Sequence, residues 1–201
     1  SSDLDLSNLD GLRETIRLVR PDVIVNAAAY TEVDKAESEG ELAYRINCLA
    51  SEVIAQESLA LDGWLVHFST DYVFDGSGSE PWDETHAVAP INHYGSSKAA
   101  GERTIVDSGC KYLILRTSWV YGARGNNFAK TMLRLAKDRE QLKVIADQVG
   151  APTGAELLAD VTAIALKQAM SAPELKGVYH VAAAGQTSWH GYRSEERRVG
   201  K

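Results

Sequence analysis

The sequence predicts an α/β fold, a doubly wound, Rossmann-like parallel sheet. Short runs that are apolar almost throughout recur along the chain, and amphipathic helical patterns separate them. Strands of that kind are buried on both faces, which is typical of a parallel sheet covered by helices. Regular alternation of such strands with helices gives right-handed crossovers. A hydroxyl residue, Thr70, follows one apolar run, at the edge where open α/β sheets bind ligands.

The first half of the chain alternates helix and strand. Ser7 or Asn8 can cap a helix that ends before Pro21. The predicted elements are a helix over 9–19, a strand over 22–26, a helix over about 32–61 interrupted near Gly40, a strand over 64–68 and a helix over 94–106.

The second half continues the alternation. The predicted elements are a strand over 112–115, a helix over 127–138, a strand over 142–145, a helix over 155–170 and a strand over 178–181. Residues 193–201 have no apolar face to bury, and we interpret them as a non-native tail without function.

Composition narrows the classes of function. The 201 residues can bury one sizeable core and part of a smaller lobe. A net charge of −7 gives no attraction to nucleic acid or to an anionic membrane, and no apolar run is long enough to cross a bilayer. Cys48 and Cys110 lie far apart without metal-like spacing, which favours two buried thiols in a reducing compartment. We therefore expect a cytoplasmic protein without nucleic-acid or membrane partners.

Three residues carry the chemistry of carbonyl reduction. Hydride addition to a ketone needs a proton donor and a hydrogen bond to the oxygen on which charge develops. Tyr94 and Lys98 stand four apart on one helix face, where the lysine ammonium would lower the pKa of the phenol toward neutrality. Thr70 can hydrogen-bond the substrate carbonyl. A tyrosine and a lysine at this spacing also occur often as an ordinary surface pair.

Four blocks in order reduce that ambiguity. Together they closely resemble dTDP-4-dehydrorhamnose reductases, of the extended short-chain dehydrogenase/reductase superfamily, over nearly all of residues 3–192. The blocks are Asn26–Glu37, Ser69–Gly76, Arg116–Gly122 and Asp147–Thr153.

The resemblance implies an activity and a set of roles. The reaction would be reduction of dTDP-4-dehydro-L-rhamnose to dTDP-L-rhamnose with NADPH or NADH, in dTDP-rhamnose biosynthesis for cell-wall polysaccharide. By motif, Tyr94 would donate the proton, Lys98 would lower its pKa and hold the nicotinamide ribose, and Thr70 would polarise the carbonyl. The other cofactor-binding residues would be Asn26, Ala27, Ala28 and Ala29.

The resemblance also implies a sugar pocket. It would be lined by Val33, Asp71, Tyr72 and Trp119. The alternative for Val33, Tyr72 and Trp119 is core packing, with function favoured only for Trp119. For the three alanines the alternative is a tightly packed strand end, which is compatible with cofactor binding. His67 and His180 are predicted to be satisfied core or edge residues, and the acidic loop with Glu80, Asp83 and Glu84 to be solvated rather than a metal site.

The chain departs from the family at its ends. The superfamily's first strand and its glycine-rich, phosphate-binding turn have no counterpart here, so we expect an internal fragment that binds cofactor poorly. Residues 1–192 would form an incomplete NAD(P)-binding domain with interleaved substrate-binding segments, about 119–130 and 147–192. The sequence does not choose between NADPH and NADH, and it leaves open a homodimer and an interface metal.

Three rival interpretations stay open at this point. A sugar-nucleotide dehydratase or epimerase of the same superfamily is one, although dehydratases usually carry an Asp-Glu pair where this chain has Asp71-Tyr72. A second is a non-catalytic regulator similar to the regulatory subunit of methionine adenosyltransferase. The third is a fragment that does not fold stably, because a lost first strand would expose a neighbouring strand edge.

Overall fold

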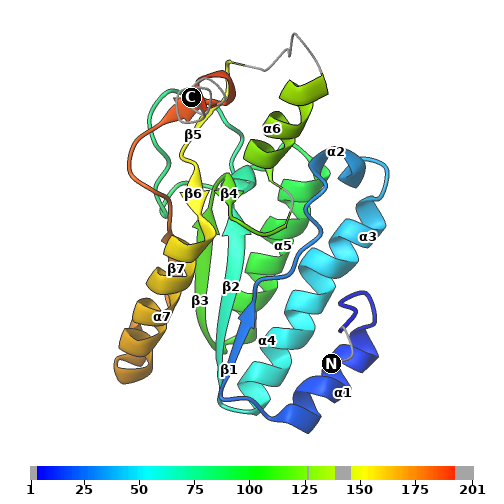
Figure 1. Cartoon of the computed structure of the whole chain (residues 1–201). Helices are drawn as coiled ribbons and strands as arrows, with labels where there is room; N and C mark the ends of the chain where they lie inside the picture. The colour runs from blue at the N-terminus through cyan, green and yellow to red at the C-terminus, as the bar shows by residue number, and fades with distance from the viewer. Residues whose placement is uncertain (1–3, 126, 139–145, 193–201) are drawn as a thin grey trace. The chain divides into compact units, whose positions relative to one another are not determined.

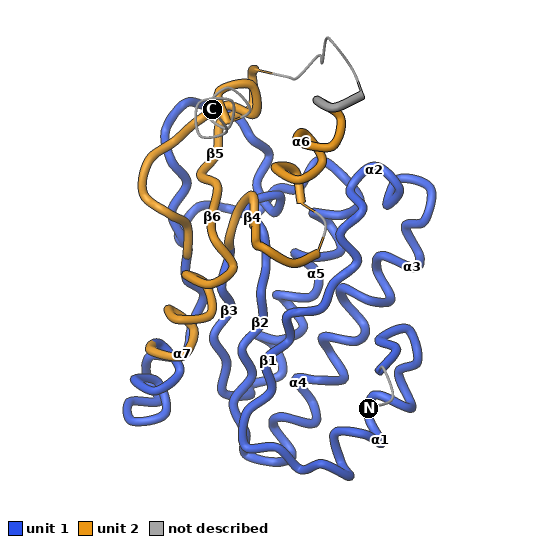
Figure 2. Tube along the Cα trace, viewed as in Figure 1, with its two compact units in different colours: residues 1–116, 165–180 blue, residues 117–164, 181–201 orange. Residues whose placement is uncertain are grey.

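The chain forms two compact units. The computed structural model describes residues 4–125, 127–138 and 146–192 (Figure 1). One unit comprises residues 1–116 and 165–180, and the other comprises residues 117–164 and 181–201 (Figure 2). The predicted strand over 142–145 and the tail over 193–201 lie outside the described residues.

The first unit is built on a four-stranded sheet of order β1-β2-β3-β7. β1 pairs with β2 and β3 pairs with β7, both in parallel. This confirms the predicted α/β class. The strands are β1 (Val23–Asn26), β2 (Trp64–Thr70), β3 (Lys111–Thr117) and β7 (Gly177–His180).

Helices α1, α4 and α5 cover one face of this sheet. They are α1 (Leu9–Val19), α4 (Ala50–Ala60) and α5 (His93–Ser108). The apolar core joins Leu12 and Ile54 of these helices to Leu65 and Ile114 of the strands. Figure 1 shows the last part of α7 (Ala155–Ser171) on the opposite side of the sheet. The Asn8 side chain accepts from the Gly11 amide, so the predicted cap of α1 is confirmed.

The long predicted helix between β1 and β2 is broken more than once. It becomes α2 (Val33–Ala36), α3 (Gly40–Tyr44), a π-helical turn over Arg45–Leu49, and α4. The first break falls beside Gly40, as predicted, but the π-helical turn was not predicted. Such turns occur frequently at functional sites.

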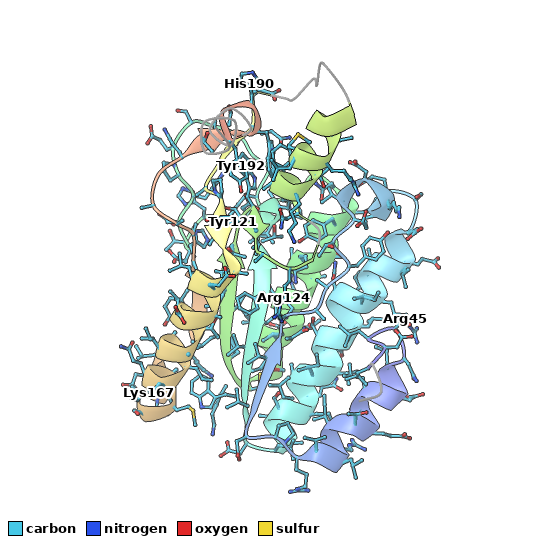
Figure 3. All side chains as sticks on the ribbon, viewed as in Figure 1. Arg45, Tyr121, Arg124, Lys167, His190 and Tyr192 are labelled. Atoms are coloured by element: carbon cyan, nitrogen blue, oxygen red, sulfur yellow. The ribbon has the colours of Figure 1, made fainter. Side chains whose placement is uncertain are left out.

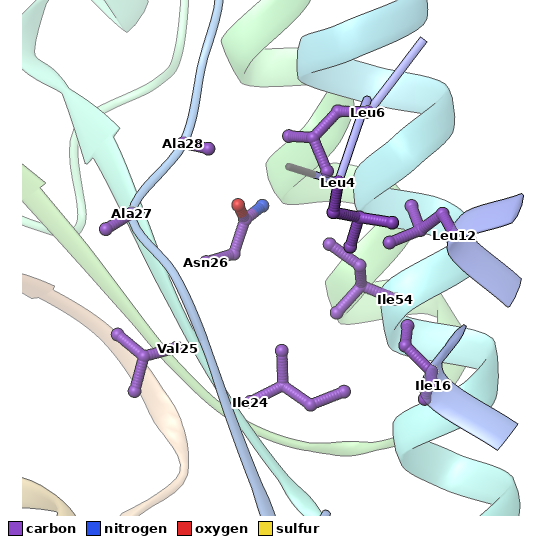
Figure 4. Close-up of a pocket in the computed structure, with 10 residues that line it drawn as sticks. All are labelled: Leu4, Leu6, Leu12, Ile16, Ile24, Val25, Asn26, Ala27, Ala28 and Ile54. Atoms are coloured by element: carbon purple, nitrogen blue, oxygen red, sulfur yellow. The ribbon is translucent and has the colours of Figure 1, made fainter. Parts of the chain in front are cut away.

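One prediction about the sheet is wrong. β1 was expected to be buried on both faces, yet Val25 is 49% exposed. Among the described strands β1 pairs only with β2 and lies at the sheet edge, so one of its faces lacks cover. Ile24 of β1 borders an apolar cavity of about 500 Å³. Residues of α1 and α4 also line this cavity (Figure 4).

The second unit has short strands and an aromatic cluster. Its strands are β4 (Val120–Tyr121) with β6 (Thr153–Gly154), and β5 (Val149–Gly150) with β8 (Thr187–Ser188). It also contains α6 (Phe128–Asp138) and the first part of α7. The Trp119 ring stacks on Trp189 at 3.6 Å between centroids. The Tyr121 ring lies 6.3 Å from that of Tyr192, and Figure 3 labels these two tyrosines. Strands of two residues show no periodicity, so they could not be predicted.

Candidate active site

Thr70 ends β2 and begins a short 3-10 turn over Asp71–Val73. The strand runs two residues beyond the prediction, which places Thr70 at its carboxyl end. The buried Thr70 hydroxyl accepts from the Tyr72 amide at 3.2 Å and donates to Asp71 Oδ1 at 3.0 Å. Its position is therefore fixed by the backbone that follows it.

Tyr94 stands in the first turn of α5 and meets Thr70. The helix is capped by Asn92, whose side chain accepts from the Gly95 amide at 2.7 Å. The Tyr72 ring packs edge-on against Tyr94 at 5.6 Å, and the Thr70 hydroxyl is close enough to influence the pKa of Tyr94. Two of the three predicted catalytic residues thus lie in one neighbourhood.

The pKa of Tyr94 differs from the prediction. Burial raises it to about 12, the Asp71 carboxylate and Tyr72 add to the rise, and the neighbouring Thr70 hydroxyl opposes it. The sequence predicted a fall caused by Lys98. That fall is not seen because the Lys98 amine turns toward β2, where it donates to the Phe68 carbonyl at 2.6 Å.

Lys98 is buried together with an unusual partner. Its Nζ lies 3.2 Å from Nε2 of His67, and the exposed fraction of Lys98 is only 2%. Burial lowers the pKa of Lys98 to about 8, with the Glu102 carboxylate opposing the shift. The amine therefore titrates close to neutral pH, as proton-transferring groups in active sites often do.

The predicted sugar-binding residues fall in both units. Asp71 and Tyr72 lie beside Thr70, and burial is the main cause that raises the pKa of each. The Asp34 carboxylate also raises the pKa of Tyr72, which places the start of α2, with the half-buried Val33, close to that ring. Trp119 belongs to the second unit, where it stacks on Trp189.

The predicted cofactor segment borders the apolar cavity. Asn26 is buried, and its Nδ2 lies 3.0 Å from Nδ1 of His67. Ala27 and Ala28 are exposed and line the cavity, so the alternative of a tightly packed strand end does not describe them (Figure 4). Their small side chains leave the backbone accessible to a flat ligand.

Asn47 in the π-helical turn fixes the loop that follows this segment. Its amide accepts from the Tyr30 amide at 2.9 Å, donates to the Tyr30 carbonyl at 3.1 Å and donates to Ser97 Oγ at 2.9 Å. Ser97 is the residue before Lys98. Asn47 therefore ties the alanine loop to the helix that carries Tyr94 and Lys98, and the sequence analysis missed it because a lone asparagine within a helical pattern gives no signal.

Two glycines of α5 were also missed. A methyl group on Gly95 would overlap the Tyr72 carbonyl oxygen, and one on Gly101 would overlap the Asn47 carbonyl oxygen. The helix can approach the site's backbone closely only because both positions lack a side chain. The sequence did offer a signal for them, because two glycines inside a helical pattern indicate places where another part of the chain packs closely against the helix.

The remaining predictions concern residues outside the site. Cys48 and Cys110 are buried free thiols, as expected. His67 is a satisfied core residue, whereas Nε2 of His180 is buried without a hydrogen-bond partner. Within the described ranges no three His, Cys, Asp or Glu residues are grouped to hold a metal, and no helix there is long and apolar enough to span a bilayer.

A threonine at the carboxyl end of a parallel strand, a tyrosine in the first turn of the helix that packs beside it, and a buried lysine one turn later define an oxidoreductase of the short-chain dehydrogenase/reductase type. The chain matches the RmlD substrate binding domain family over residues 1–196. It therefore belongs to the dTDP-4-dehydrorhamnose reductase family.

Individual relatives support this assignment. The chain is 57% identical over 200 residues to the dTDP-4-dehydrorhamnose reductase of Salmonella typhimurium, an alignment that covers 98% of this chain and 67% of that one. The Bacillus anthracis reductase, solved in complex with NADP, matches with a TM-score of 0.88 at 43% identity, over 98% of this chain and 69% of that one. The reductase of Clostridium acetobutylicum matches with a TM-score of 0.92 at 38% identity, over the same shares of the two chains. The chain thus spans about two thirds of the length of these relatives.

Proposed function

We propose that this chain carries the catalytic site for NAD(P)H-dependent reduction of dTDP-4-dehydro-L-rhamnose to dTDP-L-rhamnose. The observation that carries the proposal is the arrangement of Thr70 at the carboxyl end of β2, Tyr94 in the first turn of α5 against the Tyr72 ring, and Lys98 one turn further along that helix. Family membership supplies the substrate, because curated relatives at 56–57% identity carry the name of this reductase.

Tyr94 is the proton donor in this proposal. A pKa of about 12 keeps the phenol protonated at neutral pH, so it holds the proton that the reduced oxygen needs. An alkoxide is a far stronger base than a phenolate, so the transfer is downhill. The Thr70 hydroxyl, held at the strand end by the Tyr72 amide, adds a hydrogen bond that strengthens as charge develops on the oxygen.

We infer which of the residues present would hold a nicotinamide cofactor. When bound, NADPH or NADH supplies the hydride. Ala27 and Ala28 would hold it through the accessible backbone beside the cavity, with Ala29 and Asn26 in the same segment. Lys98 would hold the nicotinamide ribose, and its buried amine can donate hydrogen bonds in either charge state.

The sugar pocket is the finer part of the proposal. Asp71 and Tyr72 follow Thr70 directly, and Val33 begins a helix whose next residue acts on the pKa of Tyr72. For Trp119, which belongs to the second unit, a role in sugar binding stays a prediction from the sequence. The division into cofactor and substrate segments, a cytoplasmic location and a homodimer also stay predictions from the sequence.

The test is turnover with the stated substrate. The chain replaces the matching segment of the Salmonella typhimurium reductase, so that the parts of that relative outside the alignment are supplied. We expect NADPH oxidation that depends on the keto sugar nucleotide, with dTDP-L-rhamnose as product. Tyr94→Phe should lower turnover by about 100- to 10,000-fold, the usual share of a general acid.

The outcomes separate the rivals. The comparisons do not favour the regulatory or the dehydratase and epimerase interpretations. No turnover in the chimera, together with co-purification of a partner enzyme, would support the regulator instead. Loss of water from the sugar without NADPH consumption would support a dehydratase. Undiminished turnover in Tyr94→Phe would refute the role given to that tyrosine.

A further inference from the structure

His67 occupies a place that the proposed reaction does not use. It lies in β2 three residues before Thr70, with 1% of its surface exposed. Its Nδ1 lies 3.0 Å from Asn26 Nδ2, and its Nε2 lies 3.2 Å from Lys98 Nζ. The imidazole thus joins the cofactor segment after β1 to the lysine of α5.

The hydrogen bonds of this triad conflict unless the protons are shared in a definite way. A neutral imidazole has one N–H donor and one acceptor nitrogen. The amide nitrogen of Asn26 and the ammonium of Lys98 are both donors, so a single neutral ring cannot accept from both. Burial and the charge of Lys98 hold the pKa of His67 well below its usual value, so a doubly protonated ring does not resolve the conflict.

Two arrangements satisfy every group. With Lys98 protonated, Nε2 accepts from the ammonium, Nδ1 carries the ring proton, and Asn26 turns its carbonyl oxygen to accept that proton. With Lys98 neutral, Nε2 carries the proton and donates to the amine lone pair, and Nδ1 accepts from the Asn26 amide nitrogen. The contact between Asn26 Nδ2 and His67 Nδ1 corresponds to the second arrangement.

We propose that His67 is a positioning residue that couples the proton on Lys98 to the orientation of the Asn26 amide. The proton count balances: from the first arrangement to the second the triad loses one proton as Lys98 changes from ammonium to amine, and the imidazole is neutral in both, with its single proton on Nδ1 in the first and on Nε2 in the second. A change of charge on Lys98 therefore changes the orientation of the Asn26 amide, at the start of the predicted cofactor segment.

The other charged groups around the triad are accounted for. Glu102, on α5, favours the charged form of Lys98. Arg116, on β3, occupies that carboxylate through hydrogen bonds of 3.0 and 2.7 Å. From β1 the triad meets only the neutral Asn26, and the remaining acceptor of Lys98 is the neutral Phe68 carbonyl. Of the two described groups that contact Lys98 Nζ, the Phe68 carbonyl can only accept, whereas the imidazole nitrogen of His67 can accept or donate.

The test measures tautomer and charge, not turnover. Nitrogen-15 spectra of the unmodified chain report which ring nitrogen of His67 is protonated, and carbon-13 spectra of lysine Cε report the titration of Lys98, assigned with Lys98→Met. We expect the ring proton to move from Nδ1 to Nε2 at the pH at which Lys98 titrates. A tautomer that stays constant across that titration would overturn the proposal.

Variants add a second measurement. His67→Leu removes an acceptor of the ammonium, so the midpoint of Lys98 should fall by about one pH unit, whereas His67→Gln should restore it because its amide oxygen accepts. The matched control is His180→Gln, a strand histidine whose contacts are to Trp82 and Phe74, which should leave the midpoint unchanged. Equal midpoints in all the variants would contradict the proposal.

The inference rests on the proposed function only where it calls Lys98 catalytic. If the triad titrates as described while the chimera shows no turnover, the proposed function fails and the coupling stands. If turnover is found while the tautomer is fixed, the coupling fails and the proposed function stands.

Discussion

Lys98 and Glu102 stand one turn apart on α5, and these two buried ionisable groups have different partners. Glu102 meets Arg116, whose Nε and Nη2 donate to both of its carboxylate oxygens. In the described part of the chain Lys98 meets only neutral groups, the Phe68 carbonyl and the His67 ring. The Glu102 carboxylate is thus paired through both of its oxygens, whereas Lys98, with a pKa of about 8, can change its protonation state near neutral pH.

The difference separates structure from chemistry within one helix. A paired, buried charge keeps its ionisation state, because losing either partner leaves the other without compensation. An unpaired buried amine has a lowered pKa, so its charge responds to whatever binds nearby. The half of α5 that contains Tyr94 and Lys98 can therefore do chemistry, and the half that contains Glu102 holds the helix to β3.

The largest effect is expected at the paired charge. Arg116→Met leaves Glu102 buried without a partner and should lower the free energy of unfolding by about 3–5 kcal/mol. Urea titration of the chain measures it. Because Arg13 is a partly exposed member of the ion pair with Glu57, Arg13→Met should cost no more than about 1 kcal/mol.

A double substitution sharpens that result. Glu102→Met combined with Arg116→Met removes both charges and should recover most of the lost stability. If the double variant is as unstable as Arg116→Met alone, the packing of Arg116 against Phe74, where its guanidinium lies 5.1 Å from the ring centroid, decides the stability and not the charge.

The next largest effects are expected from substitutions of Gly95 and Gly101, one in each half of α5. Gly95→Ala drives a methyl group against the Tyr72 carbonyl and Gly101→Ala against the Asn47 carbonyl, so each should cost about 2–3 kcal/mol through overpacking. Turnover of the chimera should fall much further in Gly95→Ala, because that backbone positions Tyr94. The exposed Ser96→Ala is the matched control. Equal turnover in both glycine variants would remove the distinction between the halves.

The smallest effect follows from the titration of Lys98. The pKa of Lys98 falls from 10.5 to about 8 on folding. Between pH 8 and 10 the unfolded chain therefore binds more protons at this residue than the folded chain does, so the free energy of unfolding increases as the pH rises. The difference between the parent chain and Lys98→Met should grow in favour of the parent by about 2 kcal/mol over that range. Urea titrations at several pH values check this. A constant difference would mean that Lys98 is not perturbed.

The sequence could predict what depends on periodicity and local chemistry. The apolar runs of β2 and β3, the capped α1 and the shared face of Tyr94 and Lys98 all follow from spacing within one element. The direction in which Lys98 turns could not be predicted, because it depends on the carbonyl of Phe68 and on His67, which belong to another element. The hydrogen bonds by which Asn47 holds Tyr30 and Ser97 depend on a π-helical turn, and no residue pattern in the sequence predicts that turn.

The edge of the sheet shows the same division. The apolar run of β1 correctly predicted a strand, but its exposure depends on which strands lie beside it, and in the described part of the chain Val25 is 49% exposed on an edge strand. Local sequence therefore determines the element, and tertiary neighbours determine its burial and the pKa values of its groups.

The most direct test of the account follows the hydride itself. The chimera is supplied with dTDP-4-dehydro-L-rhamnose and with NADPH deuterated at the transferable position of the nicotinamide, and the sugar product is analysed by NMR. We predict deuterium on the carbon that carried the keto group, and its near disappearance in Tyr94→Phe and Lys98→Met at equal reaction time. Deuterium that is absent from that carbon in the unsubstituted chimera, or that enters the product of either variant to the same extent as in the unsubstituted chimera, would contradict the account.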